Sequence, residues 1–126
     1  MAIQKFDHFN ITAPQPLLDS VRDFYVQILG FHEGFRPNFP YSGYWLYQGE
    51  QAMIHLVVPD KGNLEANQNG YLDHIAFLCG DFEEMSNTLK SNSISFEKLT
   101  IPDTKACQLV FYDPTGLKIE LLFQTC

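Results

Sequence analysis

Apolar and polar residues alternate in two stretches of the chain that are near copies of each other. The first is Phe6-Asp7-His8-Phe9-Asn10-Ile11, and the second, 66 positions later, is Leu72-Asp73-His74-Ile75-Ala76-Phe77. An alternation with a period of two is typical of a β-strand with one buried face. Each copy carries its histidine on the more polar face. The pattern therefore predicts a repeat whose two halves both begin with an Asp-His strand.

Both halves continue with the same order of elements. A helix whose apolar residues recur at helical spacing follows the first strand, and three strands follow the helix. In the first half the helix ends before Gly30, and the turn 48–51 joins the last two strands. We expect its elements to be a strand over 3–12, a helix over 17–29, and strands over 31–35, 44–47 and 52–58.

The second half begins after a polar segment at 60–70 that is rich in turn-forming residues, which we interpret as a linker. Asp81 precedes the second helix as its N-cap, and Glu83 and Glu84 lie in its first turn. We expect the elements of this half to be a strand over 71–78, a helix over 82–91, and strands over 95–99, 108–112 and 117–123.

Each half is therefore a βαβββ unit. We expect an α+β fold in which the tandem βαβββ repeats form a curled mixed sheet around a metal-binding cavity. The curl is expected because apolar residues such as Met53 and Leu122 share the face that turns away from the helices. We interpret the chain as a single domain over 1–126, with a first unit at 1–59, the linker at 60–70 and a second unit at 71–126.

Four candidate metal ligands occupy equivalent positions in the two halves. The segment Trp45–Leu56 aligns with Val110–Leu121 without a gap, which places His55 over Glu120. Apolar residues that should face the helices flank every candidate, so strand alternation turns the candidates to the opposite face. The candidate ligands are His8, His55, His74 and Glu120.

Three imidazoles and one carboxylate suit a divalent first-row transition metal better than a calcium site or a thiolate site. For any one of these histidines alone, the alternative is an ordinary hydrogen-bonded residue of the sheet. The shared face and the repeat favour the metal site. Asp7 and Asp73 are expected to face the helices, and His32, which has no counterpart in the other half, is interpreted as a surface residue.

Composition excludes several classes of function. Of the 126 residues, 45% are hydrophobic and 14% are aromatic, which indicates a packed core and not a disordered chain. The chain has 8 basic and 15 acidic residues, and its net charge of −7 disfavours binding to nucleic acid or to an anionic membrane. No apolar run approaches the roughly 20 residues that span a bilayer. We therefore expect a small-molecule substrate, with no nucleic-acid or membrane partner.

The three cysteines are Cys79, Cys107 and Cys126, an odd number with no CxxC spacing. No charged and then apolar signal segment is recognisable at the N-terminus. We interpret the cysteines as small buried or terminal residues, and we expect a reducing, cytoplasmic setting.

The tandem repeat and its motifs resemble the vicinal oxygen chelate superfamily, which contains glyoxalases, bleomycin- and fosfomycin-resistance proteins, extradiol dioxygenases and methylmalonyl-CoA epimerases. The stretches that carry the resemblance are Phe6–His8, Asp23–Phe31, Leu72–Phe77 and Asp113–Leu121. The resemblance implies that a divalent metal, Fe, Mn, Ni, Co or Zn, binds two neighbouring oxygens of a small substrate. It also implies a homodimer, in which metal sites can form within or between chains.

The residue at position 55 bears on the reaction. A glyoxalase that acts on the glutathione hemithioacetal typically has Glu where this chain has His55, and an Asn a few residues further, in the neighbourhood of Pro59. The difference argues against dependence on glutathione. Our leading hypothesis is a metal-dependent isomerase or lyase of glyoxalase type, in which Glu120 is the catalytic carboxylate that transfers a proton.

Two loops are expected to form the walls of the substrate pocket, Arg36–Tyr44 and Thr100–Lys105. Arg36 or Lys105 would bind an anionic group of the substrate. Three aromatic residues, Phe39, Tyr41 and Tyr44, would line the pocket, and packing in a dimer is the alternative for them.

Two other functions stay open at this point. One is an Fe(II) extradiol-type dioxygenase, in which His8, His74 and Glu120 hold the iron. The other is a metal-free protein that binds a small molecule such as a drug, against which the four intact candidate ligands argue.

Overall fold

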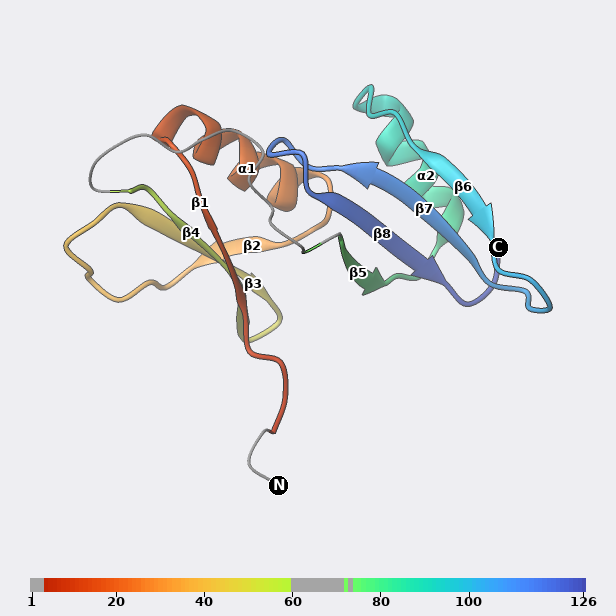
Figure 1. The fold of residues 1–126 in the computed structure, drawn as a ribbon, viewed down its shortest axis with the longest axis horizontal. Coiled ribbons are helices and arrows are strands. Elements are labelled where there is room, and N and C mark those ends of the chain that lie inside the picture. Colours follow the sequence, from red (N-terminus) through yellow and green to blue (C-terminus); the bar gives the residue numbers. More distant parts are fainter. Residues whose placement is uncertain (1–3, 60–71, 73) are drawn as a thin grey trace. The chain divides into compact units, whose positions relative to one another are not determined.

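A computed structural model of the chain describes residues 4–59, 72 and 74–126. The chain divides into two compact units, Met1–Glu65 and Ala66–Cys126. In its described part each unit contains one helix and one four-stranded sheet (Figure 1). The predicted linker at 60–70 lies outside the described residues.

Unit 1 is a mixed sheet with one helix. Its elements are β1 (Phe9–Thr12), α1 (Gln15–Gln27), β2 (His32–Gly34), β3 (Gly43–Gln48) and β4 (Gln51–Val57). The strand order is β1-β4-β3-β2, in which β1 is parallel to β4 and the other neighbours are antiparallel. The sheet therefore places the first strand of the unit beside its last one.

Unit 2 repeats this arrangement. Its elements are β5 (His74–Leu78), α2 (Phe82–Ser91), β6 (Glu97–Thr100), β7 (Cys107–Tyr112) and β8 (Lys118–Phe123). The order β5-β8-β7-β6, with β5 parallel to β8, is the same as in unit 1. The prediction of an α+β fold built from tandem βαβββ repeats is confirmed.

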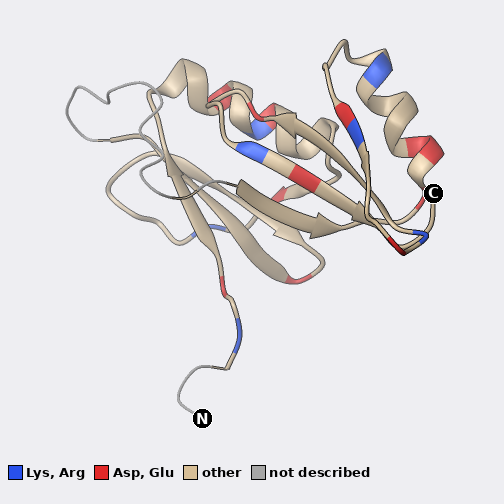
Figure 2. Cartoon of the chain, turned by 45° about the vertical axis from the view of Figure 1, so that its right-hand side comes forward, with Lys and Arg blue, Asp and Glu red and all other residues tan. Residues whose placement is uncertain are grey.

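The predicted bounds agree with the observed ones for α2 but not for α1. α2 begins and ends where it was predicted, because the Asp81 side chain accepts a hydrogen bond of 3.1 Å from the backbone N–H of Glu84. Acidic side chains lie near the start of this helix and Lys90 lies in its last turn (Figure 2), which complements the helix dipole. α1 begins two residues earlier than predicted, at Gln15, because Pro16 is tolerated in a first turn, where its missing N–H has no partner to lose.

Each unit has its own apolar core on the helix side of its sheet. In unit 1, residues of α1 pack against alternate residues of β3 and β4, and the fully buried ones are Leu18, Val21, Tyr25, Leu46, Ile54 and Leu56. In unit 2 the corresponding residues are Leu89, Leu109, Phe111 and Ile119. The residues on either side of His55 and of Glu120 are thus buried, as the alternation predicted.

Neither of the two helices described has the length and apolar character needed to cross a bilayer.

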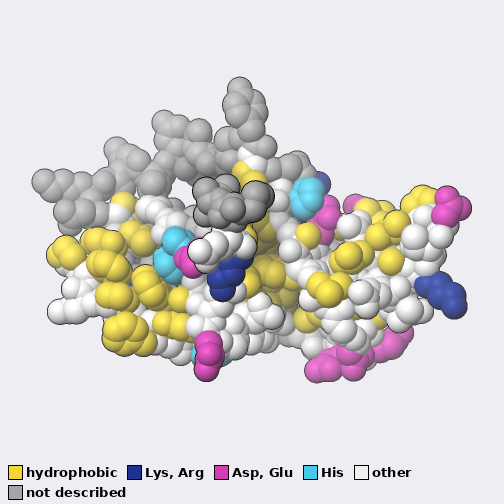
Figure 3. Space-filling model, turned by 90° about the horizontal axis from the view of Figure 1, so that it is seen from below, with side chains coloured by type: hydrophobic (Ala, Val, Ile, Leu, Met, Phe, Trp, Pro, Cys, Tyr) yellow, Lys and Arg dark blue, Asp and Glu magenta, His cyan; other side chains and the backbone are white. Residues whose placement is uncertain are grey.

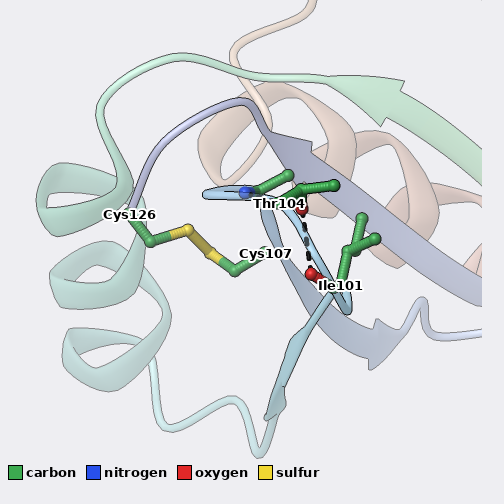
Figure 4. The surroundings of a disulfide bond; sticks show 5 residues. Ile101, Thr104, Cys107 and Cys126 are labelled. Carbon is green, nitrogen blue, oxygen red and sulfur yellow. Dashed lines mark hydrogen bonds between the residues drawn. A yellow bond between two sulfur atoms is a disulfide. The ribbon is translucent and has the colours of Figure 1, made fainter.

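The cysteines differ from the sequence-based interpretation. Cys107, at the start of β7, forms a disulfide with Cys126 at the end of the chain, with Cα atoms 6.1 Å apart (Figure 4). The sequence analysis interpreted these two residues as small buried or terminal ones and did not predict their bond, which forms because the fold returns the chain end to β7. Cys79 is free, and burial raises the pKa of its thiol. Since disulfides are rare in reducing compartments, the cysteines no longer support a cytoplasmic setting.

We predict that Cys126→Ser lowers the free energy of unfolding by about 3 kcal/mol, because the disulfide closes a loop over a sequence separation of 19 residues. Urea unfolding in the absence of reductant measures the difference. With dithiothreitol present, the variant and the wild-type chain should unfold alike. Equal stability without reductant would contradict the prediction.

Candidate functional site

The first two candidate ligands lie against each other on the sheet of unit 1. β1 pairs with β4 so that Asn10 lies opposite His55, and His8 precedes Asn10 by two residues on the same face. The two imidazole rings are stacked, with centroids 3.7 Å apart and planes at 11°. The indole of Trp45 covers the other side of His55 at 4.0 Å, also at 11°. Three rings therefore form one continuous stack, and sequence analysis did not assign Trp45 to it.

Each imidazole in this pair has one nitrogen bound and one available. Nδ1 of His8 lies 2.6 Å from Oδ2 of Asp7, and Nε2 of His55 lies 3.1 Å from the carbonyl oxygen of Ala52. No described residue bonds to the second nitrogen of either ring. An acceptor on one nitrogen fixes the tautomer and leaves the lone pair of the other nitrogen for a metal. The expectation that Asp7 faces the helix was wrong, because Asp7 is exposed and contacts His8.

The environment keeps His55 neutral. Burial lowers the pKa of His55 below its ordinary value of 6.5, and the positive charge that His8 can carry lowers this pKa further. The hydrogen bond from His8 lowers the pKa of Asp7. The neutral imidazole is the form in which histidine binds a metal, so this environment suits His55 to be a ligand.

The other two candidate ligands form an equivalent pair in unit 2. Ala76 of β5 lies opposite Glu120 of β8, and His74 precedes Ala76 by two residues, which is the same offset as in unit 1. Nε2 of His74 is 3.5 Å from Oε1 of Glu120. Nε2 of Gln108 donates a hydrogen bond of 3.0 Å to the same oxygen. The repeat therefore places a His-Glu pair where unit 1 has a His-His pair.

Gln108 is a second residue that sequence analysis did not select. Val110 of β7 lies opposite Glu120, and Gln108 precedes Val110 by two residues, so it shares a face with the carboxylate. The alternation of residues along β7 could have pointed to Gln108, because every second residue of this strand is buried and Gln108 lies on the other face. A polar residue on the less buried face next to a predicted ligand could have been identified as its partner.

The donor set of the two pairs fits a divalent transition metal, because it offers imidazole nitrogens and one carboxylate with fixed orientations. The described part of the chain contains no group of three or more metal-binding side chains in ligating arrangement. A site with all four ligands therefore requires the pair of unit 1 to meet a pair of unit 2, in the same chain or in a second copy. That assembly remains a prediction.

Unit 1 also has two hollows near these residues. One, of about 520 Å³, is bordered by Trp45, His55 and Asp7. The other, of about 580 Å³, is bordered by the loop between β2 and β3 and by Tyr44. Figure 3 shows hydrophobic side chains gathered on one face of unit 1, next to histidine, acidic and basic side chains.

Four of the five predicted substrate-binding residues border the second hollow. The guanidinium of Arg36 covers the rings of Phe39, at 5.0 Å, and Tyr41, at 5.3 Å. Tyr44 lines the same hollow, but its hydroxyl donates to Asp19 of α1 at 2.6 Å, and this hydrogen bond raises the pKa of Tyr44.

Lys105, the fifth residue, is exposed between β6 and β7 in unit 2 and lines neither hollow. The structure therefore gathers the aromatic residues and Arg36 in unit 1. The role of Lys105 stays a prediction.

We predict that His55 titrates below pH 6.5 in protein from which metal has been removed, and that His8→Asn moves its pKa back toward 6.5. NMR titration of the imidazole signals measures both values. Because the unfolded chain then binds the proton at higher pH than the folded one, His55 makes folding less favourable as the pH falls below 6.5. A pKa for His55 at or above 6.5 in the wild-type protein would contradict the prediction.

Solved structures with the same fold span nearly the whole chain. A putative glyoxalase family protein from Bacillus anthracis is 24% identical, with a TM-score of 0.74 and coverage of 99% of this chain and 98% of that one. A lactoylglutathione lyase from Agrobacterium tumefaciens is 18% identical, with a TM-score of 0.70 and coverage of 98% and 96%. TnmS3, an antibiotic binding protein from Streptomyces sp. CB03234, is 19% identical, with a TM-score of 0.71 and coverage of 99% of both chains.

The family comparison agrees with these structures. No curated protein sequence matches the chain. The family model of the Glyoxalase/Bleomycin resistance protein/Dioxygenase superfamily matches residues 5–121, which include all four candidate ligands. The chain therefore belongs to the Glyoxalase/Bleomycin resistance protein/Dioxygenase superfamily.

Proposed function

We propose that the chain is a metal-dependent isomerase or lyase that acts on a small substrate with two neighbouring oxygens. The observation that carries the proposal is the matched pair of donors in each unit, His8 with His55 and His74 with Glu120, at the same offset in the strand register. Two unrelated contacts would have no reason to recur at equivalent positions of a repeat. A shared ligand gives such a reason.

The residues around the pairs support this assignment. Asp7 and the Ala52 carbonyl hold one nitrogen of each imidazole in unit 1, so the other nitrogen is presented in one tautomer. Gln108 holds one oxygen of the Glu120 carboxylate. A divalent metal bound by the four ligands would polarise the two substrate oxygens and make an adjacent C–H group more acidic.

Glu120 is the group proposed to move the proton. Its side chain is only 15% exposed, so it is shielded from water in unit 2. Gln108 bonds to Oε1 and no described residue bonds to Oε2. The carboxylate can therefore take a proton at Oε2 from one carbon of the substrate and return it to the neighbouring atom.

The fold alone does not separate catalysis from binding, because a lactoylglutathione lyase and an antibiotic binding protein both share it. The donor pairs are what favour a metal enzyme over a metal-free binder. His55 in place of the Glu expected of a glutathione-dependent glyoxalase favours a substrate other than the glutathione hemithioacetal.

We predict that protein purified without a chelator or a histidine tag contains or takes up one transition metal ion for each set of four ligands. Glu120→Ala should abolish stoichiometric binding. Asp7→Asn should weaken binding by about 10–100-fold, because Asp7 orients a ligand without being one. Elemental analysis and calorimetric titration with Ni²⁺, Co²⁺ and Zn²⁺ measure both effects.

The matched control is His32→Asn. His32 is an exposed imidazole that stacks on Tyr47 at 5.8 Å, on the edge strand of unit 1 opposite β1, and its loss should leave metal affinity unchanged. Absence of metal together with failure of loading would refute the proposal. Uptake of oxygen by the Fe(II)-loaded protein with a catechol would identify a dioxygenase instead.

A further inference from the structure

Arg36 carries a positive charge that no acidic residue in the described part of the chain neutralises. One of its terminal nitrogens, Nη2, donates to the Tyr41 carbonyl oxygen at 3.0 Å. Its Nε is buried and has no acceptor among the residues that the structure describes. Arg22, in the same unit, is different because it pairs with Asp23 at 3.1 Å. The net charge of the chain is −7, yet this guanidinium has no acidic partner in the described residues. A partly buried positive charge without a partner costs free energy, and a bound anion would remove that cost.

Two aromatic rings hold this guanidinium in place. Phe39 and Tyr41 are stacked, with centroids 5.2 Å apart and planes at 8°, and Arg36 lies over both. A guanidinium over a ring face keeps its charge and loses part of its hydration. Its planar fork remains suited to a carboxylate or a similar oxyanion. The cluster therefore combines a flat apolar surface with one positive charge.

The loop that carries the cluster is held before any ligand binds. The backbone N–H of Val58 donates to the Ser42 carbonyl at 2.9 Å, and the N–H of Phe39 donates to the Pro37 carbonyl at 2.8 Å. A Cβ at Gly43 would lie 2.1 Å from the Leu56 carbonyl oxygen and 3.1 Å from Nη2 of Arg36. Only glycine lets the backbone come so close beneath the guanidinium. The hollow of about 580 Å³ beside it is within the usual size of a small-molecule site.

The cluster is connected to the metal-ligand pair of unit 1 by further rings. Phe39 lies 6.1 Å from Trp45, at 45°, and Trp45 stacks on His55 at 4.0 Å. Aromatic surface thus continues from Arg36 to the imidazoles within one unit. A ligand with an anionic end at Arg36 would lay its body along Phe39 and Trp45.

We propose that Arg36, Phe39 and Tyr41 form an anion-binding subsite, and that the substrate is a planar, largely apolar carboxylate or related organic oxyanion. This inference rests on the proposed function for the reaction, since it names the class of molecule that the same site takes. The subsite itself lies in unit 1 and needs no metal. If Arg36 served only to close its loop through the Tyr41 carbonyl, the site would show no preference for charge.

The test compares phenylacetate with its neutral counterpart phenylacetamide, and with acetate. Binding to the full-length protein as purified, and again after removal of metal, is followed by the fluorescence of Trp45, the single tryptophan of the chain. We expect phenylacetate to bind at least about tenfold more tightly than phenylacetamide, because hydrogen bonds to charged groups are the stronger ones. Acetate, which lacks the ring, should bind more weakly than phenylacetate.

Variants assign the preference to the cluster. Arg36→Gln should make the affinities for the acid and the amide equal, and Arg36→Lys should keep part of the preference. Phe39→Leu should weaken both aromatic probes and retain the preference for charge. The matched control is Lys98→Gln, which removes a cation that lies over Phe82 at 4.8 Å in unit 2. This variant should leave the affinities for all three probes unchanged.

Equal affinities of the wild-type protein for acid and amide would overturn the proposal, as would a preference that persists in Arg36→Gln. Thermal unfolding shows whether each variant is folded. If Arg36→Gln does not fold, the comparison of phenylacetate with phenylacetamide in the wild-type protein still tests the proposal. Loss of the preference with intact metal binding would refute this inference alone. A preference that depends on Arg36 in a protein that binds no metal would refute the proposed reaction and support the subsite.

Discussion

Parallel pairing between the first and last strands of each unit brings together side chains that lie far apart in the sequence. In unit 1 the register places Asn10 opposite His55, and a histidine two residues earlier reaches the facing ring. In unit 2 the register places Ala76 opposite Glu120, with the same consequence. Neither donor pair can form without this register. The helix, the hairpin and the core of each unit all serve to hold it.

The apolar core holds the register because one face of each sheet is buried under the helix and the other face is more exposed. Ile54 and Leu56 lie on either side of His55 and are fully buried under α1, and each contributes roughly 1.5–3 kcal/mol through burial. A slip of one residue would exchange the two faces of the strand. It would expose these side chains and bury an imidazole without its partners, at a cost of several kcal/mol more. The apolar residues thus determine the face on which the candidate ligands lie.

In the proposed function the two units use equivalent positions for different chemistry. Unit 1 supplies two imidazoles, a stack of rings and the charge of Arg36, which no acidic residue in the described part of the unit neutralises. Unit 2 supplies the only carboxylate among the four donors, Glu120, and the amide of Gln108 that holds it. Such a division would keep the proposed anion-binding residue, Arg36, and the proposed base, Glu120, in different units. A carboxylate beside Arg36 would compete with the ligand for that charge.

The sequence by itself determined the element order, the repeat, the bounds of α2 and the face on which each candidate ligand lies. These follow from local rules, namely alternation, helical spacing and the Asp81 cap, which act over a few residues. The tertiary structure decided the start of β1, the stacking of His8 and Trp45 on His55, and the disulfide between Cys107 and Cys126. Three cysteines allow three pairings, and only the path of the chain brings its end to β7. Contacts between distant residues depend on how packed elements meet, and no local pattern of residues records that.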